Sequence, residues 1–555
     1  MREELTPDKG PIEEKSSSGD SPNFFTRGYR FFREILNSES GHWFSLTCLS
    51  LIFGLLLVTL EAYGVSPLYY QANLLSYDPD MYKTFGAMMV EGAIPYVDIL
   101  DIKGPYLFFY SYLAALISYQ WGAYILQWLV ASVAFLLTFD TLRRLGLTGR
   151  YRFACLGVFA IFSGIMMEGH NADDSMLELL CLTTWALVIA LKSDNPWSRS
   201  LASLSVGLAA GILVFTRATS ASLCLGCAVI LIAILIHRKD YRGIWLYTLI
   251  PGFIGAAITL SIPFIYYGTI GEIPALIEWN FTRPLTYFTS HGYSWERWMS
   301  LGFTLALFIC EGIPLYRIRK AVPGEHLAVA SFLLIFQTIV SLAFYVSMRH
   351  MRGGLPAYLL VAGLPLIFSQ EKFTKSKEIA TPAIAEPTSE AAQPMEGLIH
   401  SKRGLIPLII ACGFLPALLL FSIGFTTYVY AGEAYRIAKS LYSLRETIPE
   451  KDRASGKILA VDLPAGVYQN VGAVPTFAVP CLQSWNESFI PDMEELVVSY
   501  IRNKATWVIV NGRPYEHPEI TPIYQRKRMM QALKDLFEYR NDLSYEGTYL
   551  VYERV

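Results

Sequence analysis

The chain has 555 residues, of which 53% are hydrophobic and only 17% are charged, and its mean hydropathy is +0.36. This composition excludes an ordinary soluble protein, which needs far more charge to cover its surface. The formal net charge of −2 gives no reason to expect a nucleic-acid partner.

The chain begins with residues 1–43, which carry charges, Gly, Pro and a run of serines but no cleavable signal pattern. We expect a cytoplasmic tail there. Residues 44–430 then alternate apolar blocks with short charged clusters, which predicts a polytopic α-helical membrane domain of about eleven transmembrane helices. The expected spans are 44–63, 121–141, 152–168, 175–192, 201–215, 218–237, 244–267, 298–315, 326–346, 354–369 and 405–428. The run 201–215 is short for a hydrocarbon core that needs about 20 residues.

Lysine and arginine gather in alternate loops, which sets the orientation. Cytoplasmic loops are enriched in these cations. The rule places the N-terminus inside and the last segment outside, provided that 105–118 lies at the membrane interface. That Tyr-rich segment is too short to span comfortably, so we expect an interfacial helix. The cationic loops contain Arg143, Arg144, Arg150 and Arg152, then Lys192 and Arg199, then Arg238, Lys239 and Arg242, then Arg317, Arg319 and Lys320, and finally Lys372 to Arg403.

Three segments outside the spans have their own character. The first outer loop, 64–120, is long and holds acids. The cytoplasmic stretch 371–403 is rich in Pro, Ala and Glu and is expected to be disordered. The last segment, 431–555, alternates strand and helix patterns, which predicts a small extracytoplasmic α/β domain. It contains no nucleophile elbow or phosphate-binding glycine loop, so we expect it to cover or shape a site.

Asp78 and Asp80 follow the first span, in the sequence Tyr77-Asp78-Pro79-Asp80. A proline after Asp78 favours a turn into a helix, so Asp78 could be only an N-cap. As a functional group, a carboxylate here could remove a proton from an acceptor hydroxyl. The Asp-x-Asp pair could also hold a divalent cation, although the pattern is short and metal dependence stays open.

Two further acidic clusters belong to the predicted outer face. Asp98, Asp101 and Lys103 precede the interfacial helix, and Lys103 could pair with Asp101 or with a lipid phosphate. The tight loop Gly169-His170-Asn171-Ala172-Asp173-Asp174 would set a second carboxylate opposite the first, or would only cap the next helix.

Cations on the same face complete the candidate site. Guanidinium groups suit phosphate oxygens, while the alternative is that they reach lipid headgroups without a catalytic role. These residues are Arg217, Arg283, Arg349, His350 and Arg352.

The motif D-x7-G-x5-G-x-x-PY-x-D-x-x-D-x-KGP over Asp78–Pro105 resembles the first outer loop of bacterial GT-C glycosyltransferases. These are polytopic relatives of protein O-mannosyltransferases and of the lipid A aminoarabinose transferase. The GHNADD loop resembles their second acidic loop, and RHMRGGLPAYLLVAGLPL resembles a later segment. The likeness extends over most of residues 44–515, and its PYxDxxDxKGP core is the specific part.

The resemblance implies an inverting transfer of a sugar from a polyprenyl-phosphate donor to a lipid, glycan or protein acceptor during cell-envelope glycan assembly. It implies that Asp78 is the catalytic base, with Asp80 as the alternative, and that Asp174 or Asp173 is the second acid. Residues implied to bind the donor phosphate are Lys103, Arg217, Arg349 and Arg352. Those expected to bind substrate are Tyr82, Tyr96, Asp98, Asp101, His170, Asn171, Asp173 and His350. Pro79 and Met351 depart from the family pattern.

The main rival is a multi-pass transporter or a flippase of envelope precursors. Transporters tend to show paired halves with broken helices at the midplane. No such repeat is visible here, and the acids lie in outer loops rather than within spans. A polymerase-like or ligase-like enzyme with a lipid-pyrophosphate donor, and a structural protein whose outer domain binds a partner, are further alternatives.

Overall fold

The computed structural model describes residues 39–68, 77–147, 159, 169–172, 174–285, 295–320, 324–344, 354–363, 432–482, 486–487, 489–490, 492–512, 523–545 and 548–555. The predicted span 405–428, all but one residue of 152–168, the linker 371–403 and the tail before residue 39 lie outside these ranges.

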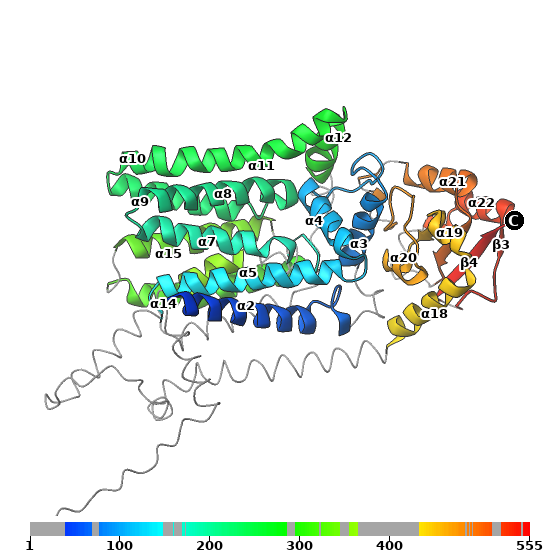
Figure 1. Ribbon diagram of the computed structural model, residues 1–555, viewed down its shortest axis with the longest axis horizontal. Coiled ribbons are helices and arrows are strands. Elements are labelled where there is room, and N and C mark those ends of the chain that lie inside the picture. Colours follow the sequence, from blue (N-terminus) through cyan, green and yellow to red (C-terminus); the bar gives the residue numbers. More distant parts are fainter. Residues whose placement is uncertain are drawn as a thin grey trace, which may run out of the picture. The chain divides into compact units, whose positions relative to one another are not determined.

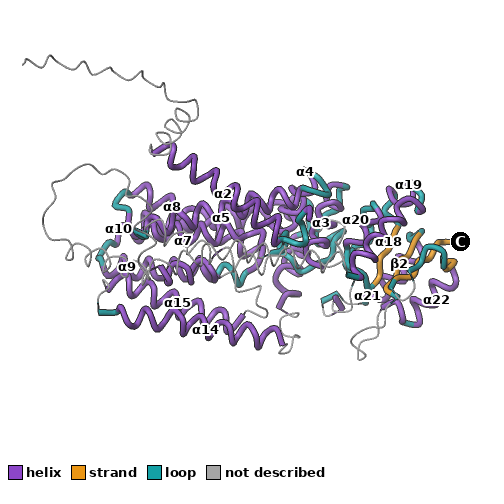
Figure 2. The backbone as a smooth tube through the Cα atoms, turned by 90° about the horizontal axis from the view of Figure 1, so that it is seen from below, coloured by secondary structure: helices purple, strands orange, loops and turns teal. Residues whose placement is uncertain are grey.

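The membrane domain consists of helices that lie side by side, as α5, α7, α8, α9, α11, α14 and α15 do in Figures 1 and 2. Its helices are α2 (Glu39–Glu61), α3 (Tyr77–Val90), α4 (Pro105–Ile117), α5 (Gly122–Arg144), α7 (Leu177–Lys192), α8 (Pro196–Arg217), α9 (Ser222–His237), α10 (Tyr241–Ile244), α11 (Ile250–Thr269), α12 (Ile273–Ile277), α14 (Trp295–Ile318) and α15 (Gly324–Phe344). A short 3-10 turn, η2 (Asp174–Met176), precedes α7, and two π-helical turns, η3 (Trp245–Leu249) and η4 (Glu278–Thr282), interrupt the later helices.

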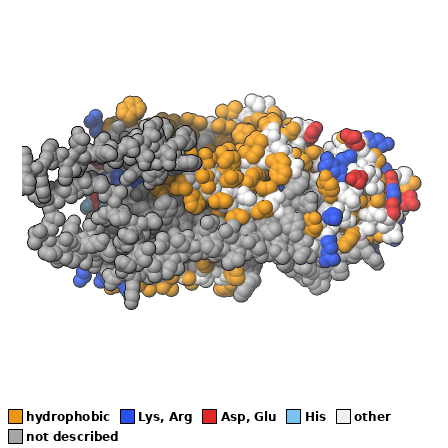
Figure 3. Space-filling model, turned by 60° about the horizontal axis from the view of Figure 1, so that its bottom comes forward, with side chains coloured by type: hydrophobic (Ala, Val, Ile, Leu, Met, Phe, Trp, Pro, Cys, Tyr) orange, Lys and Arg blue, Asp and Glu red, His pale blue; other side chains and the backbone are white. Residues whose placement is uncertain are grey.

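Six helices in the described ranges are long and apolar enough to cross a membrane: Gly122–Arg144, Asp174–Lys192, Pro196–Arg217, Tyr241–Thr269, Trp298–Ile318 and Gly324–Ala343. Hydrophobic side chains cover the described surface of this part in Figure 3, and charged ones gather on the part that carries the sheet. The prediction of a polytopic helical membrane protein is therefore confirmed, while the count of eleven spans remains a prediction.

The predicted span 201–215 was too short. The helix α8 has 22 residues because it begins at Pro196, where Asn195 acts as the N-cap and accepts a hydrogen bond from the Trp197 N–H at 3.0 Å. A proline in the first helical turn has no N–H to leave unpaired, which favours this start. Polar residues at the helix start hid the extra turn from a hydropathy pattern.

Glycines let α8 and α11 approach closely. A Cβ on Gly207 would lie 2.0 Å from the Gly252 carbonyl oxygen, and one on Gly255 would lie 2.3 Å from the Leu204 carbonyl oxygen. Between membrane helices, where apolar lipid removes the usual hydrophobic drive, such close backbone packing is a main source of association.

Among the described residues, the cationic loops around Arg144, Lys192 and Arg238 contact each other at one end of the helices, and their assignment to the cytoplasmic side stays a prediction. Arg199 pairs with Asp240 at 2.7 Å, and Arg238 pairs with Glu325 at 2.5 Å. The Lys192 ammonium also donates a hydrogen bond to the Arg144 carbonyl. Loops assigned to the cytoplasmic side thus contact each other. The loops predicted to be outer loops meet at the opposite end of the helices.

The C-terminal part forms a four-stranded sheet with the order β1-β2-β4-β3. Strands β1 (Ile458–Val461) and β2 (Trp507–Asn511) are parallel, while β4 (Tyr549–Arg554) is antiparallel to β2 and to β3 (Phe537–Tyr539). The accompanying helices are α18 (Glu433–Thr447), α19 (Glu450–Ala454), α20 (Gly466–Val471), α21 (Met493–Asn503) and α22 (Lys527–Leu536), with a short turn, η8 (Ile523–Gln525). Strand and helix positions agree with the α/β pattern of the sequence, which missed α19, α20 and β3.

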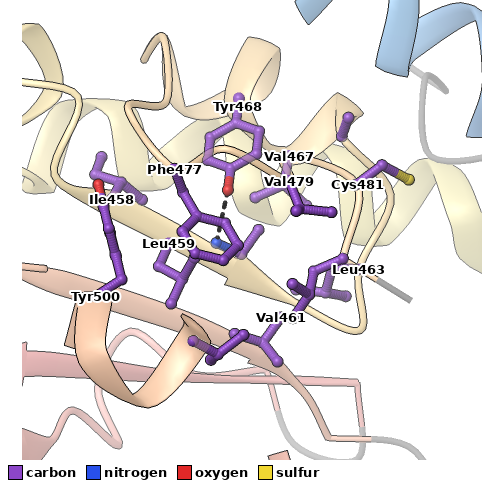
Figure 4. Close-up of a cluster of buried hydrophobic side chains, with 14 of the residues drawn as sticks. Ile458, Leu459, Val461, Leu463, Val467, Tyr468, Phe477, Val479, Cys481 and Tyr500 are labelled. Carbon is purple, nitrogen blue, oxygen red and sulfur yellow. Dashed lines mark hydrogen bonds between the residues drawn. The ribbon is translucent and has the colours of Figure 1, made fainter. Parts of the chain in front are cut away.

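The core of this α/β domain lies between β1 and the segments that follow it (Figure 4). Every residue of β1 is buried, as its unbroken apolar run requires. The Tyr468 hydroxyl accepts a hydrogen bond from the Ala460 N–H at 3.0 Å, which satisfies a buried polar group. Cys481 lies at the edge of this cluster in Figure 4, with its sulfur pointing away from the other labelled side chains.

Candidate active site

Asp78 and Asp80 occupy the first turn of α3, where the helix dipole favours negative charge. Their environments differ. Asp80 is fully buried and pairs with the Lys83 ammonium at 2.6 Å, and Lys83 also donates to the Gly64 carbonyl at 2.9 Å. Asp78 is only half-buried. Asp78 is therefore the more exposed of the two carboxylates, and Asp80 is held within the protein.

Burial raises the pKa of Asp80 to about 6, although the adjacent Lys83 acts in the opposite direction. Asp101 shows the same behaviour, because burial raises its pKa to about 6 while Lys103 lowers it and the charge of Asp78 raises it. Asp78, Asp101 and Lys103 are therefore electrostatic neighbours, as the sequence motif that joins them suggested.

The loop between α3 and α4 is a rigid turn rather than an open strand. The Tyr96 N–H donates to the Ile99 carbonyl at 2.7 Å, and the exposed Asp98 carboxylate accepts from the Ile94 N–H at 2.9 Å. Tyr96 itself adopts a left-handed backbone conformation, with φ of 67°. A non-glycine residue in that region marks a position fixed by its surroundings. Asp98 thus caps the turn.

Two buried groups fix the backbone at Lys103. The Asp101 carboxylate accepts from the Lys103 N–H at 3.0 Å, and the Tyr96 hydroxyl donates to the Lys103 carbonyl at 2.5 Å. The Lys103 ammonium lies 5.8 Å from the centre of the Tyr82 ring. Tyr82, Tyr96 and Asp101, all expected to bind substrate, are buried and contact Lys103, and their part in substrate binding stays a prediction.

Gly104 packs against the backbone at the end of α8. A Cβ on Gly104 would lie 1.5 Å from the Phe215 carbonyl oxygen and 2.9 Å from the Thr216 nitrogen, so only glycine allows this approach. Arg217 ends α8 one residue later, and its Nε donates to the Thr219 hydroxyl at 3.3 Å. The two cations predicted to bind phosphate therefore belong to adjoining backbone segments, although they are far apart in the sequence.

The loop before α7 is held in shape by hydrogen bonds to one of its own residues, Asp174. Asp174 is fully buried and accepts from the Gly169 N–H at 2.8 Å, while the Asn171 side chain accepts from the Asp174 N–H at 2.8 Å. Gln127 on α5 holds the same loop, since its side chain accepts from the His170 N–H and donates to the Asp174 carbonyl, each at 3.1 Å. The Asp174 carboxylate thus closes its own loop and does not cap α7, and its role as the second acid stays a prediction.

The His170 ring is buried between two tyrosines. Its centre lies 5.2 Å from that of Tyr110 and 6.3 Å from that of Tyr82. Burial and the Lys83 charge lower the pKa of His170 to about 3, so the imidazole is neutral at physiological pH. His170 packs near Tyr82 and lies close enough to Lys83 to feel its charge, so it connects the loop before α7 to the first turns of α3.

The α/β domain contacts the first outer loop directly. The Leu100 N–H donates to the Ala478 carbonyl at 2.8 Å. Cys481 is buried in the same segment, and burial together with the charges of Asp78, Asp101 and Asp80 raises its pKa. Arg283, predicted as an outer cation, stacks on Trp279 at 4.2 Å and donates to the Phe489 carbonyl, so it also binds this domain.

Several predicted site residues lie outside the described ranges: Asp173, Arg349, His350 and Arg352. Sequence reasoning missed three residues that support the site, Lys83, Gln127 and Cys481. Lys83 could have been found, because it lies three residues after Asp80 on one helix face. Within the described ranges, no three His, Cys, Asp or Glu side chains lie close enough to hold a metal ion.

The fold is similar to solved structures. One is ArnT from Cupriavidus metallidurans bound to undecaprenyl phosphate, with a TM-score of 0.54, 12% identity, and coverage of 93% of this chain and 99% of that chain. The apo state of the same protein gives a TM-score of 0.55 and 13% identity, with the same coverage. An Archaeoglobus fulgidus oligosaccharyltransferase in complex with Zn and sulfate gives a TM-score of 0.40 at 12% identity, covering 83% of this chain and 68% of that chain, which is too low to argue from.

No family model matches the chain, and no curated protein sequence matches it. The similarity is therefore one of fold, and it extends over nearly the whole length of both chains. The chain is a polytopic membrane protein with the fold of ArnT, as its apolar blocks predicted.

Proposed function

We propose that this protein is a glycosyltransferase that moves a sugar from a polyprenyl-phosphate carrier to an acceptor hydroxyl on the non-cytoplasmic side of the cell membrane. Asp78 is the general base that takes the acceptor proton. Lys103 and Arg217 bind the carrier phosphate and stabilise the charge that develops on it as the sugar leaves. Attack from the face opposite the phosphate would invert the anomeric centre.

The observation that carries this proposal is the contact of Gly104 with Phe215 and Thr216. It packs the backbone beside Lys103 against the end of α8, which carries Arg217, and the half-buried Asp78 acts electrostatically on Asp101 of the same loop. A phosphate leaving group needs cations to bind it, and an acceptor hydroxyl needs a base to take its proton. Lys103, Arg217 and Asp78 are groups of these two kinds, so together they suit transfer of a sugar from a lipid phosphate. The ArnT structure bound to undecaprenyl phosphate supports a carrier of this chemistry. The sugar and the acceptor remain open among lipid, glycan and protein.

The other predicted residues take supporting parts in this proposal. Asp80 is paired with Lys83 and stabilises the start of α3, so it is not the first choice as base. Asp174, His170 and Asn171 shape the loop beside α3. Arg349, Arg352 and His350 are proposed as further ligands of the donor. A divalent cation held by Asp78 would have to compete with Lys83 for Asp80.

The test is transfer from a radiolabelled polyprenyl-phosphate sugar by the purified full-length protein. The donor is the lipid-linked sugar that accumulates in cells lacking the gene. Asp78→Asn should lower kcat by roughly 10²–10⁴-fold, the usual loss for a missing general base, with the protein still folded. Glu91→Gln is the matched control, since Glu91 is an exposed carboxylate just after α3 with no part in the site.

Lys103→Ala and Arg217→Ala should mainly weaken donor binding and transition-state stabilisation together, lowering kcat/KM. Full transfer by Asp78→Asn would overturn the assignment of the base. Absence of any accumulated lipid-linked sugar, together with altered solute uptake in the deletion strain, would favour the transporter alternative.

A further inference from the structure

A cavity of about 60 Å³ lies at the end of the helices that carries the cationic loops. It is enclosed by the last turns of α7 and α9, the first turns of α15, Leu145 after α5, and Leu360 of the segment 354–363. In Figure 1 this is the end where α9 turns into α10. None of the residues assigned to the candidate active site lines the cavity, so the proposed reaction does not account for it.

The wall of the cavity combines an apolar floor with a polar rim. Eight of its twelve lining residues are apolar, among them Leu187, Ile234 and Val329. The polar ones come from the last turn of α7, from the residue after α9 and from the first turn of α15, and they are Lys192, Arg238, Glu325 and His326. Because these positions are all at helix ends, the polar groups share one level of the helices. This arrangement suits a ligand with a polar head and an apolar body.

Two cations on the rim are held by the protein in different ways. The Arg238 guanidinium donates to Glu325 at 2.5 to 3.2 Å and to the Leu191 carbonyl at 3.3 Å, so its donors are largely occupied. The Lys192 ammonium donates one hydrogen bond, to the Arg144 carbonyl. Its other two N–H bonds have no partner among the described residues, and its side chain is exposed. Lys192 is therefore fixed in place and still able to bind an anion.

The linked charges around the cavity leave an excess of positive charge. The Asp140 carboxylate is shared by Arg143 and Arg144, so one of those two positive charges is not balanced. Lys192 adds another, while the ion pair at Arg238 is neutral. The group thus holds four cations and two carboxylates, a net charge of +2. The positive end of α15, which begins at the cavity, adds to this charge.

Exposed aromatic rings lie at the same end of the helices. Trp197 at the start of α8 is 83% exposed, and Tyr241 and Trp245 after α9 are 61% and 62% exposed. The ion pair between Arg199 and Asp240 joins these two segments. Tryptophan and tyrosine are enriched where a membrane protein meets the lipid headgroups. An anion that reaches the cavity at this level is therefore part of a lipid.

We propose that this cavity binds the phosphate group of an anionic membrane phospholipid. A cavity needs roughly 10–15 Å³ for each water-sized group, so one of about 60 Å³ admits about four to six, which matches the heavy atoms of a phosphate. Lys192 donates to the phosphate, and the net positive charge selects an anionic headgroup. Basic pockets between membrane helices are known to bind such headgroups. The bound lipid ties together the ends of α7, α9 and α15, whatever reaction the protein catalyses.

The test measures lipid binding to the full-length protein by native mass spectrometry. The two probes are phosphatidylglycerol and phosphatidylcholine with the same acyl chains. Both contain a phosphate, but only phosphatidylglycerol has a net negative charge. We expect phosphatidylglycerol to bind about tenfold more tightly, and we expect inorganic phosphate not to displace it, because phosphate lacks the apolar part. Equal binding of the two lipids would overturn the proposal. Displacement by inorganic phosphate would also overturn it, in favour of a site for a soluble anion.

Lys192→Gln should weaken phosphatidylglycerol binding about fivefold, the factor that corresponds to about 1 kcal/mol for one cation near a membrane surface. The matched control is Lys239→Gln, because Lys239 is exposed at the same end and does not line the cavity. It should change the binding much less. Equal losses in the two variants would show only a general attraction between surface charge and anionic lipid, and would overturn the cavity assignment.

Glu325→Gln should act in the opposite direction. It removes a carboxylate from the rim and releases Arg238 to bind the phosphate, so phosphatidylglycerol binding should strengthen about fivefold. The pair is partly exposed, with exposed fractions of 36% and 32%, so its loss should have little effect on folding. A gain in binding also cannot come from a folding defect. Unchanged or weaker binding by Glu325→Gln would overturn the proposal.

Discussion

The Lys83 ammonium lies 2.6 Å from the Asp80 carboxylate at a place where both side chains are almost wholly buried, with exposed fractions of 5% and 0%. A buried ion pair adds little to stability overall, since burying two charges has a large cost of its own. Removing one partner is different, because it leaves the other charge buried without compensation. The pair therefore affects the stability of the region around α3 more than it affects the proposed reaction.

Asp80→Asn and Lys83→Gln should each lower the free energy of unfolding by about 3–5 kcal/mol, the range for breaking a buried pair from one side. The double variant should recover a large part of that loss, because no buried charge remains. Unfolding in detergent by a chemical denaturant measures all three. Strictly additive losses would contradict the pairing. A variant of exposed Asp98 serves as the control.

Asp101→Asn should change how stability depends on pH. The Asp101 carboxyl has a pKa near 3.8 when unfolded and about 6 when folded, so the folded state binds the proton more tightly. The stability that protonated Asp101 contributes to the folded state is fully present below pH 3.8. It is lost as the pH rises through 6, and the total loss is about 3 kcal/mol. The melting temperature of Asp101→Asn minus that of the wild type should therefore rise between pH 5 and pH 7.5.

The difference between the two proteins is the quantity to measure, because burial of neutral His170 acts in the opposite direction. Its pKa falls from 6.5 to about 3 on folding, so its contribution is lost as the pH drops below 6.5. A difference that stays flat with pH would contradict the buried state of Asp101.

Gly104→Ala should disturb the packing of the backbone beside Lys103 against the end of α8. Its new methyl group would lie 1.5 Å from the Phe215 carbonyl oxygen, so one backbone segment must move. We expect binding of undecaprenyl phosphate to weaken about tenfold or more, because displacing one cation by an ångström is costly at such a site. Gly302→Ala is the control, since a Cβ there meets nothing within 4 Å. Unchanged binding by Gly104→Ala would contradict the paired-cation site.

Leu100→Pro should loosen the α/β domain from the first outer loop. Proline has no N–H, so the bond to the Ala478 carbonyl is lost, whereas Leu100→Ala keeps it. Buried Cys481 reports the change, because its thiol should react with a maleimide faster in the proline variant than in the alanine variant. Equal labelling of both variants would show that this hydrogen bond does not hold the domain in place.

The sequence predicted the parts of the site that depend on local pattern. Asp78 and Asp80 begin a helix because a proline and two acids favour a helix start, and α4 is too short to span because its apolar run ends early. Each of these follows from residues within a few positions of one another.

The rest depends on contacts between distant segments. Nothing near Gly104 indicates that it must touch Phe215, and nothing near Cys481 indicates that the charges of three carboxylates act on it. The difference between Asp78 and Asp80 was likewise invisible, because it comes from tertiary burial rather than from spacing. Roles for Asp173, Arg349, His350 and Arg352 stay predictions.

The hydrogen bond between Leu100 and Ala478 joins an early loop to a segment near the end of the chain. During synthesis, the helices around Asp78 enter the bilayer long before Ala478 leaves the ribosome. The surroundings of Leu100 are therefore unfinished until the α/β domain has been made and has folded, so a truncated or stalled chain has the acidic loop without the segment that packs on it.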